Sequence, residues 1–440
     1  MPAYMNRRLA LCIALAATAI ARGASAQVSA GQGEVTIGYQ GLPYKSTGES
    51  NTGVQVSEGV LLHVGAGVEA GYDSNVFYSE SGSEVASPLL RIGLFGDMSN
   101  ATRTGAVGQL LFDVRAGVVY RRYQSDNVNV QNFSNAWMPT AGLGLSTGGG
   151  QFGFGFADTF ARLEDPPYNP TPVPITRYNN QASVEGRWAP GGGRITATLR
   201  YTNVVDIFQD FYEYASTDTN IVMLDGSWKW LPKTAIFLNA QQGYIFYLND
   251  AQAMANGKSS SYPLQLTTGL RGLLTEKTSA ILALGYTNGF YANGPTTGGF
   301  LGSSYAELAF TLRPTMLSRI VAGYRHDFTN AVIASFSYND TGYASYVQQI
   351  AGRLALDLSG RYVHRRYQGD FVDSSQGPTP AMPNQPQRVD DFIQGGVSLD
   401  YFVRNWIYAG LAYSVLSNSS NIASVEYLKQ QMFVRLGITY

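Results

Sequence analysis

The side chains in this sequence best suited to acid–base chemistry are its three histidines, His63, His326 and His364. A hydrolase needs such a base within hydrogen-bond reach of a nucleophile or an activated water. No serine-bearing elbow and no metal-binding spacing accompanies them, and the single cysteine, Cys12, lies in an N-terminal apolar stretch. We therefore expect no enzyme, no metal site and no cofactor. The alternative is an outer-membrane lipid hydrolase, which would need a serine hydroxyl beside His326 or His364.

Charged residues form a second candidate site, because they often stand two positions apart with opposite signs. Asp113 and Arg115 do so, as do Glu185 and Arg187. Residues at this spacing share one face of a β-strand, and placing them against lipid would cost about 2–4 kcal/mol each. We expect them to line a water-filled pore, with a bracing ladder of ion pairs as the alternative for any single residue. Neither sign dominates, so no strong ion selectivity follows. The predicted pore-lining residues are Glu69, Arg91, Asp113, Arg115, Glu185, Arg187, Arg200, Asp225, Lys229, Arg271, Glu307, Arg319, Arg325, Asp357, Arg361, Asp400 and Arg435.

The elements that carry these charges have the alternating pattern of β-strands with different surroundings on their two faces. Between residues 107 and 121, Leu110, Phe112 and Val114 fall on one face, and Asp113 and Arg115 on the other. A soluble sandwich would produce the same alternation, so a single strand does not separate the two architectures. About eighteen such stretches are predicted, with sixteen as the alternative count. They are 59–72, 86–97, 105–121, 131–145, 150–162, 176–188, 193–207, 217–230, 233–247, 260–273, 278–290, 303–313, 317–328, 341–350, 353–366, 388–402, 405–417 and 427–440.

The connections between the stretches favour a barrel. Tight turns such as 146–149, 189–192 and 231–232 alternate with long polar segments such as 249–259 and 368–388. Short periplasmic turns alternating with long extracellular loops are typical of outer-membrane barrels. The chain after its first residues contains no apolar run long enough for a transmembrane helix. The sequence therefore predicts an all-β, transmembrane antiparallel β-barrel.

Aromatic residues sort by strand direction, as expected for girdles at two membrane interfaces. The last strand alternates apolar residues and ends in Tyr440, which resembles a signal read by the outer-membrane assembly machinery. The pairs 121–122 and 365–366 are Arg-Arg, and their guanidinium groups could meet lipopolysaccharide phosphates. The girdle residues are Tyr72, Tyr120, Tyr244, Tyr286, Tyr324, Tyr362 and Tyr413 at one end, and Trp188, Trp230, Tyr401 and Tyr440 at the other.

The N-terminal residues stand apart from the strands. Residues 1–26 combine Arg7 and Arg8, an apolar stretch and a small-residue cleavage site, so they predict a signal peptide. Residues 27–58 predict a periplasmic or lumen-inserted extension, and residues 59–440 the barrel. The whole chain has 30 basic and 31 acidic residues, and this near-neutral balance argues against nucleic acid as a partner.

Residues 65–77, Gly-Ala-Gly-Val-Glu-Ala-Gly-Tyr-Asp-Ser-Asn-Val-Phe, resemble the opening of the putative β-barrel porin type 2 family of bacterial outer-membrane proteins. Some members are associated with exopolysaccharide or capsule export. The resemblance implies a pore for a polysaccharide, with a periplasmic polysaccharide export protein as a partner. It carries over no site residues. A general porin-like diffusion channel for hydrophilic solutes is the alternative.

Overall fold

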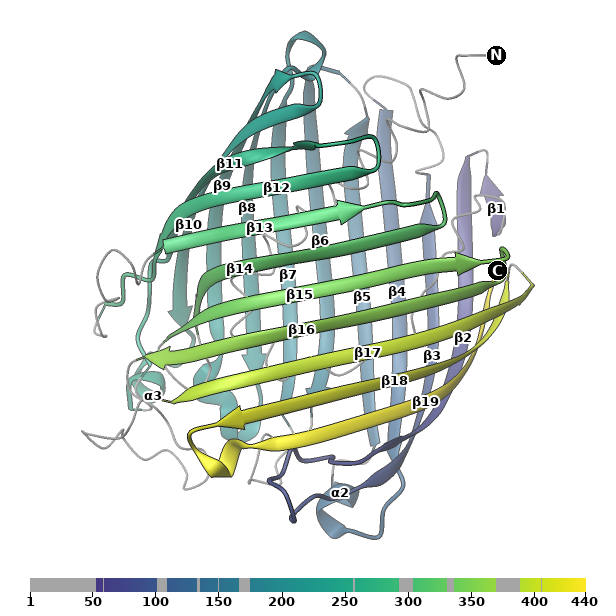
Figure 1. The fold of residues 1–440 in the computed structure, drawn as a ribbon. Helices are drawn as coiled ribbons and strands as arrows, with labels where there is room; N and C mark the ends of the chain where they lie inside the picture. The colour runs from purple at the N-terminus through teal and green to yellow at the C-terminus, as the bar shows by residue number, and fades with distance from the viewer. Residues whose placement is uncertain are drawn as a thin grey trace.

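The chain closes into a single β-barrel (Figure 1). The computed structural model describes residues 53–440 apart from 58, 101–108, 133–134, 149, 166–174, 256–257, 293–303, 331–335, 369–387 and 405. Each strand from β2 to β19 pairs antiparallel with the next, and β19 pairs back onto β2, from Gln431 opposite Asp73 to Thr439 opposite Gly65. The barrel therefore has the predicted eighteen strands. The signal peptide and most of the predicted extension lie outside the described residues.

The strand positions agree with those predicted from the alternation. The strands are β1 (Val54–Ser57), β2 (Val60–Asp73), β3 (Ser87–Ser99), β4 (Gln109–Tyr123), β5 (Asn135–Gly148), β6 (Phe152–Asp165), β7 (Ile175–Trp188), β8 (Ile195–Phe208), β9 (Thr217–Leu231), β10 (Thr234–Tyr247), β11 (Leu264–Leu273), β12 (Thr278–Asn288), β13 (Ser304–Leu312), β14 (Ser318–Asn330), β15 (Phe336–Ile350), β16 (Leu354–Gln368), β17 (Val389–Arg404), β18 (Ile407–Ser420) and β19 (Tyr427–Thr439). The helical segments are α2 (Val128–Asn132), α3 (Asp250–Ala255), η1 (Gly191–Gly193), η2 (Asp210–Ala215) and η4 (Ala423–Val425).

The two faces of each strand meet different surroundings. Along β19, Val434 and Leu436 are 57% and 58% exposed, whereas the intervening Phe433 and Arg435 are 3% and 1% exposed. Apolar side chains dominate the exposed outer surface, and closure pairs the backbone of every strand, which is what a lipid environment requires. The barrel is therefore a membrane-spanning one. Among the described residues, no helix is both long and apolar enough to cross a membrane.

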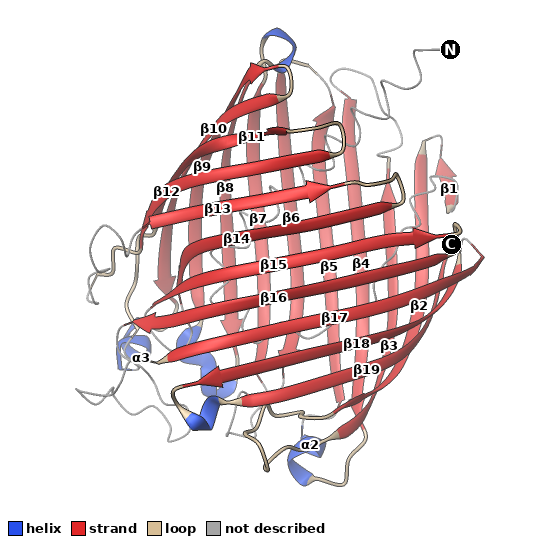
Figure 2. Ribbon diagram, in the orientation of Figure 1, coloured by secondary structure: helices blue, strands red, loops and turns tan. Residues whose placement is uncertain are grey.

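The two ends of the barrel differ in their connections. At one end, called here the turn end, β9 finishes at Leu231 and β10 begins at Thr234, and the C-terminal residue Tyr440 pairs with Val64. At the other end, called the loop end, the connections include residues 74–86 and 248–263. Helical segments gather mainly at the loop end (Figure 2). By the rule for outer-membrane barrels, the turn end faces the periplasm.

Two parts of the fold differ from the prediction. The strands expected at 317–328 and 341–350 extend to 318–330 and 336–350, because Phe328 and Tyr338 continue the pairing, so their connection is short. The short strand β1 was not predicted as a separate element. It pairs with β2 around Leu61 and Leu62, where β2 projects beyond the end of β19.

Candidate functional site

The inner wall of the barrel is the candidate functional site. Every charged residue predicted to line the pore lies, by strand alternation, on the face opposite the exposed apolar side chains. Their surroundings differ widely, and whether they line an open pathway stays a prediction. Glu69, Arg91, Asp400 and Arg435 are buried; Arg115, Arg187, Lys229 and Arg319 are exposed; Asp113, Glu185, Arg200, Asp225, Arg271, Glu307, Arg325, Asp357 and Arg361 are intermediate.

The buried charges form one row across the barrel seam, defined here as strands β17, β18, β19, β2 and β3. Arg435 of β19 donates two hydrogen bonds to Asp400 of β17, each 2.6 Å long. On its other side Arg435 is the cross-strand partner of Glu69, and Arg91 approaches Glu69 at 3.5 Å. The intervening position on β18 is Gly410, whose missing side chain leaves the space in which Arg435 and Asp400 meet.

The segment with the family resemblance lies beside this row and helps to close the barrel. Asp73 ends β2 and forms an ion pair of 2.8 Å with Lys429 of β19, with both side chains almost completely buried. The Lys429 ammonium also donates to the Asn75 carbonyl at 2.9 Å, and the Asn75 amide donates to the Leu428 carbonyl at 3.2 Å. These contacts tie the first barrel strand to the last. The predicted first strand ended at residue 72, within this segment, and in the structure the turn that follows it is directed inward.

Residues 75–79 are buried against the inner wall at the loop end, whereas residues 80–84 are exposed. Val76 packs with Phe433 of β19 and with Val130 of helix α2. Tyr78 packs against inward-facing residues of β16 to β19, including Tyr427, at 5.1 Å between ring centroids. Its backbone has φ of 55°, a strained conformation for tyrosine, which the surrounding contacts hold. This inward loop therefore narrows the lumen on the seam side of the loop end.

The short helix η2 packs on another part of the inner wall and narrows the lumen there. Tyr212, Tyr214 and Ala215 are buried, next to the inward-facing Phe208 of β8. Burial, with a smaller contribution from Tyr212, raises the pKa of Tyr214 to about 12. The Tyr214 phenol therefore stays neutral at physiological pH.

Beyond the seam strands, the wall carries charges in contact with water. The Arg115 side chain on β4 is 55% exposed and lies 2.7 Å from Asp113 and 3.4 Å from Asp97 of β3. Arg200 donates from Nε to Glu185 at 2.9 Å. These pairs are cross-strand or same-strand neighbours, which is the ladder that the sequence left open as an alternative. The same side chains are exposed to water and form ion pairs. A pore lining and a bracing ladder of ion pairs therefore do not exclude one another.

The histidines at the loop end lie on the outer face. His326, Asp340, His364 and Asp391 are successive cross-strand partners on β14, β15, β16 and β17. The Nδ1 atoms of the two rings lie 2.7 and 2.8 Å from the carboxylate oxygens of Asp340 and Asp391, respectively. No hydrogen bond joins either ring to a serine hydroxyl among the described residues. The geometry therefore lends the hydrolase alternative no support, and the absence of catalysis remains an expectation.

The sequence analysis placed Tyr324 and Tyr362 in an aromatic girdle but missed the aspartates that they contact. The Tyr324 hydroxyl donates to Asp340, and the Tyr362 hydroxyl donates to Asp391, both at 2.5 Å. A signal was present, because the spacing Tyr-x-His occurs twice, at 324–326 and 362–364. Among the described residues, no cluster of histidines and carboxylates could hold a metal ion.

The two Arg-Arg pairs each divide between the faces of the barrel. Arg121 is buried inside, and Arg365 donates to Asn339 at 3.0 Å on the inner side. Arg122 and Arg366 are the exposed, outward members. Only one arginine of each pair can therefore reach lipid headgroups.

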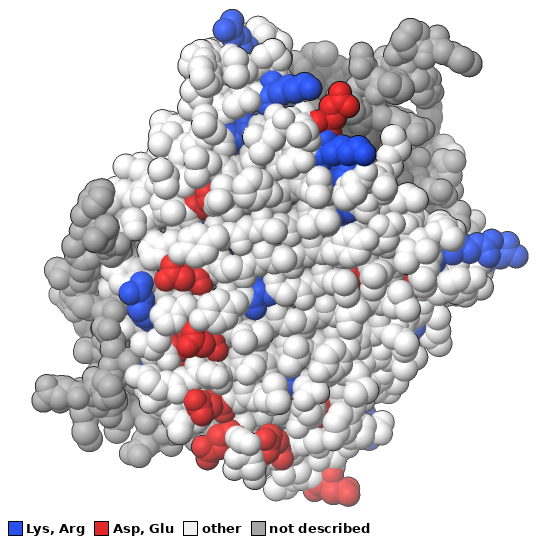
Figure 3. Space-filling model, in the orientation of Figure 1, with Lys and Arg blue, Asp and Glu red and all other residues white. Residues whose placement is uncertain are grey.

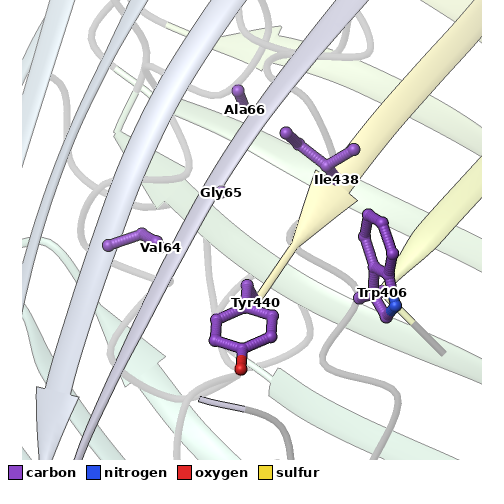
Figure 4. Close-up of a pocket in the computed structure, with 6 residues that line it drawn as sticks. All are labelled: Val64, Gly65, Ala66, Trp406, Ile438 and Tyr440. Atoms are coloured by element: carbon purple, nitrogen blue, oxygen red, sulfur yellow. The ribbon is translucent and has the colours of Figure 1, made fainter. Parts of the chain in front are cut away.

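A cavity of about 490 Å³ lies at the turn end of the seam (Figure 4). Its side chains are apolar or aromatic and belong to the outer face, so it opens toward lipid and is separate from the inner pathway. The lining residues are Val64, Gly65, Ala66, Trp406, Ile438 and Tyr440.

The closed barrel, its apolar outer surface, its charged inner wall and its alternating turns and loops define an outer-membrane β-barrel protein. Its location is the bacterial outer membrane.

Comparison with solved structures finds proteins with similar barrels. OccAB3 from Acinetobacter baumannii has 10% identity and a TM-score of 0.46, covering 86% of this chain and 99% of that one. The outer membrane protein opdK from Pseudomonas aeruginosa has 10% identity and a TM-score of 0.45, with the same coverage. The siderophore receptor PirA from Acinetobacter baumannii has 7% identity and a TM-score of 0.44, covering 86% and 80%. No protein-family model and no curated protein matches the chain. The finer resemblance of residues 65–77 therefore remains a prediction.

Proposed function

We propose that this protein is an outer-membrane channel for hydrophilic material and that its cargo is an exported polysaccharide. The observation that carries the channel is the exposure of inward-facing charges. Arg115 is 55% exposed although it lies on the inner face of a closed barrel. A wall that solvates charged side chains requires water inside.

The polysaccharide cargo is supported by the resemblance of residues 65–77 to an export-associated family. A periplasmic polysaccharide export protein would dock at the turn end, and the assembly machinery would act on β19. Arg122 and Arg366 would meet lipopolysaccharide at the loop end. A general diffusion channel is the second candidate. It is favoured by the mixture of positive and negative side chains along the wall.

Two measurements test the proposal. Purified, folded barrel in a planar bilayer is expected to conduct ions, and a folded preparation that never conducts contradicts the channel. Cells lacking the protein are expected to accumulate polysaccharide in the periplasm. Normal polymer secretion together with impaired uptake of small hydrophilic solutes would replace export with general diffusion.

A further inference from the structure

Basic residues mark the turn end of the barrel. Every tight turn from β7–β8 to β17–β18 carries an exposed lysine or arginine, and Glu276 is the one acidic residue in the described parts of these turns. Figure 3 shows the same polarity on one outer face, where most blue side chains lie toward the turn end and most red ones toward the loop end. One basic residue from each turn, in order, is Arg194, Lys233, Lys277, Arg313, Arg353 and Arg404.

Three further basic residues lie inside the barrel, just above these turns. Arg187 is the second-last residue of β7, Lys229 lies near the end of β9, and Arg319 is the second residue of β14. Each has the inward strand parity and is exposed. Among the described residues, none of the three forms an ion pair. Their positive charge is therefore available to material in the lumen.

Arginines already pair with most of the inward-facing carboxylates. Asp113 pairs with Arg115, and Glu185 with Arg200. Asp225 lies 4.0 Å from Arg271, and the seam carboxylates have their own arginines. Asp357 and Glu307 are half-buried and have no ion pair among the described residues, and Asp97 shares Arg115 with Asp113. At the turn end, Arg187, Lys229 and Arg319 therefore outnumber the two carboxylates that lack an arginine of their own, Asp357 and Asp97.

We propose that Arg187, Lys229 and Arg319, which stand on β7, β9 and β14 around the turn-end mouth, capture an anionic polysaccharide that arrives from the periplasm. This inference rests on the proposed function and specifies its cargo class. A channel mouth with an excess of one sign of charge concentrates solutes of the opposite sign. The inward position of the three residues separates them from membrane lipid. A protein docked on the rim would meet the turn tips first.

The test compares two triple variants that lose the same charge. The lumenal variant is Arg187→Gln/Lys229→Gln/Arg319→Gln, and the matched control is Lys233→Gln/Lys277→Gln/Arg353→Gln at the turn tips. Binding of labelled polygalacturonate to the folded full-length barrel in neutral detergent is measured at low and high salt, with neutral dextran as the comparison polymer.

The native barrel is expected to bind polygalacturonate and not dextran, with affinity falling as salt rises. The lumenal variant is expected to bind roughly tenfold or more weakly, whereas the control keeps its affinity within about threefold. Equal binding of both polymers by the native barrel overturns the proposal. An equal loss of affinity in the control also overturns the proposal, because polygalacturonate then binds the basic residues of the turn tips as well.

Bilayer recordings separate this inference from the proposed channel. Under a potassium chloride gradient, the native barrel is expected to show an anion-selective reversal potential that moves toward zero in the lumenal variant. Conduction without anion preference and without polygalacturonate binding overturns the capture site and leaves the channel intact. A barrel that binds polygalacturonate but never conducts overturns the channel instead.

Discussion

The seam and the rest of the inner wall share one sequence pattern but use their charges differently. At the seam, Arg435, Asp400 and Glu69 are at most 1% exposed, and each charge has a close partner. Beyond the seam, Arg115 on the adjoining strand β4 is 55% exposed, and Arg187 on β7 has no ion pair among the described residues. The same alternation of apolar and charged residues thus gives a packed joint in one region and a wet surface in the other.

The energetic consequences differ accordingly. Removing one partner of a buried pair leaves an uncompensated charge in a poorly solvated site, which is strongly destabilising. An exposed pair gains little, because water and salt screen it. The seam charges therefore hold the barrel closed, and the exposed charges are free to act on solutes.

The largest expected effect comes from breaking the seam. Arg435→Ala leaves Asp400 and Glu69 without their shared arginine, so the free energy of unfolding should fall by roughly 3–5 kcal/mol. Urea-induced unfolding in lipid vesicles, followed by tryptophan fluorescence, measures the change. Arg187→Ala serves as the control on the open wall. If both variants lose the same stability, the distinction between the two regions is wrong.

A smaller effect is expected from Gly410→Ala. An added Cβ would overlap the Asp400 carboxylate and lie 2.9 Å from Arg435 Nε. Overpacking of this kind costs about 1–3 kcal/mol, measurable in the same unfolding assay. Gly186→Ala is the matched control, because nothing lies within 4 Å of its added Cβ. A native-like Gly410→Ala barrel would show that the Asp400 and Arg435 pair tolerates displacement.

Releasing the inward loop tests whether its packing at the seam narrows the lumen, with single-channel conductance as the measurement. Tyr78→Ala removes the ring that packs on Tyr427 and lies 4.1 Å from the Lys429 ammonium. We expect residues 74–86 to detach from the wall without unfolding the strands, which raises the single-channel conductance. Tyr72→Ala, at the exposed outer girdle, should leave the conductance unchanged. An unaltered conductance in Tyr78→Ala would mean that this loop does not narrow the pathway.

The smallest effect on stability is expected on the open wall. Arg115→Gln removes a mostly exposed cation from its contacts with Asp113 and Asp97, and should change the free energy of unfolding by about 1 kcal/mol or less. The unfolding curve should overlay that of the native protein at high salt. A loss as large as that of Arg435→Ala would place Arg115 among the structural charges.

The fold was largely predictable because strand alternation and turn chemistry are local properties. The eighteen stretches, the closing one among them, were identified without tertiary contacts. The end of β14 was predicted too early and the start of β15 too late, because Phe336 and Tyr338 are equally compatible with an aromatic-rich loop. Strand β1 was missed, since its pairing depends on the overhang of β2 beyond β19.

The sequence predicted which charged side chains point into the barrel, but not which of them are buried. The sequence by itself determined which residues point inward, because side chains alternate along any strand whatever surrounds it. It could not determine which inward charges are buried, because that depends on partners far away in the chain, such as Asp400 for Arg435 and Lys429 for Asp73. Only closure of the barrel and the inward path of residues 74–86 decided which charges brace the wall and which meet the lumen.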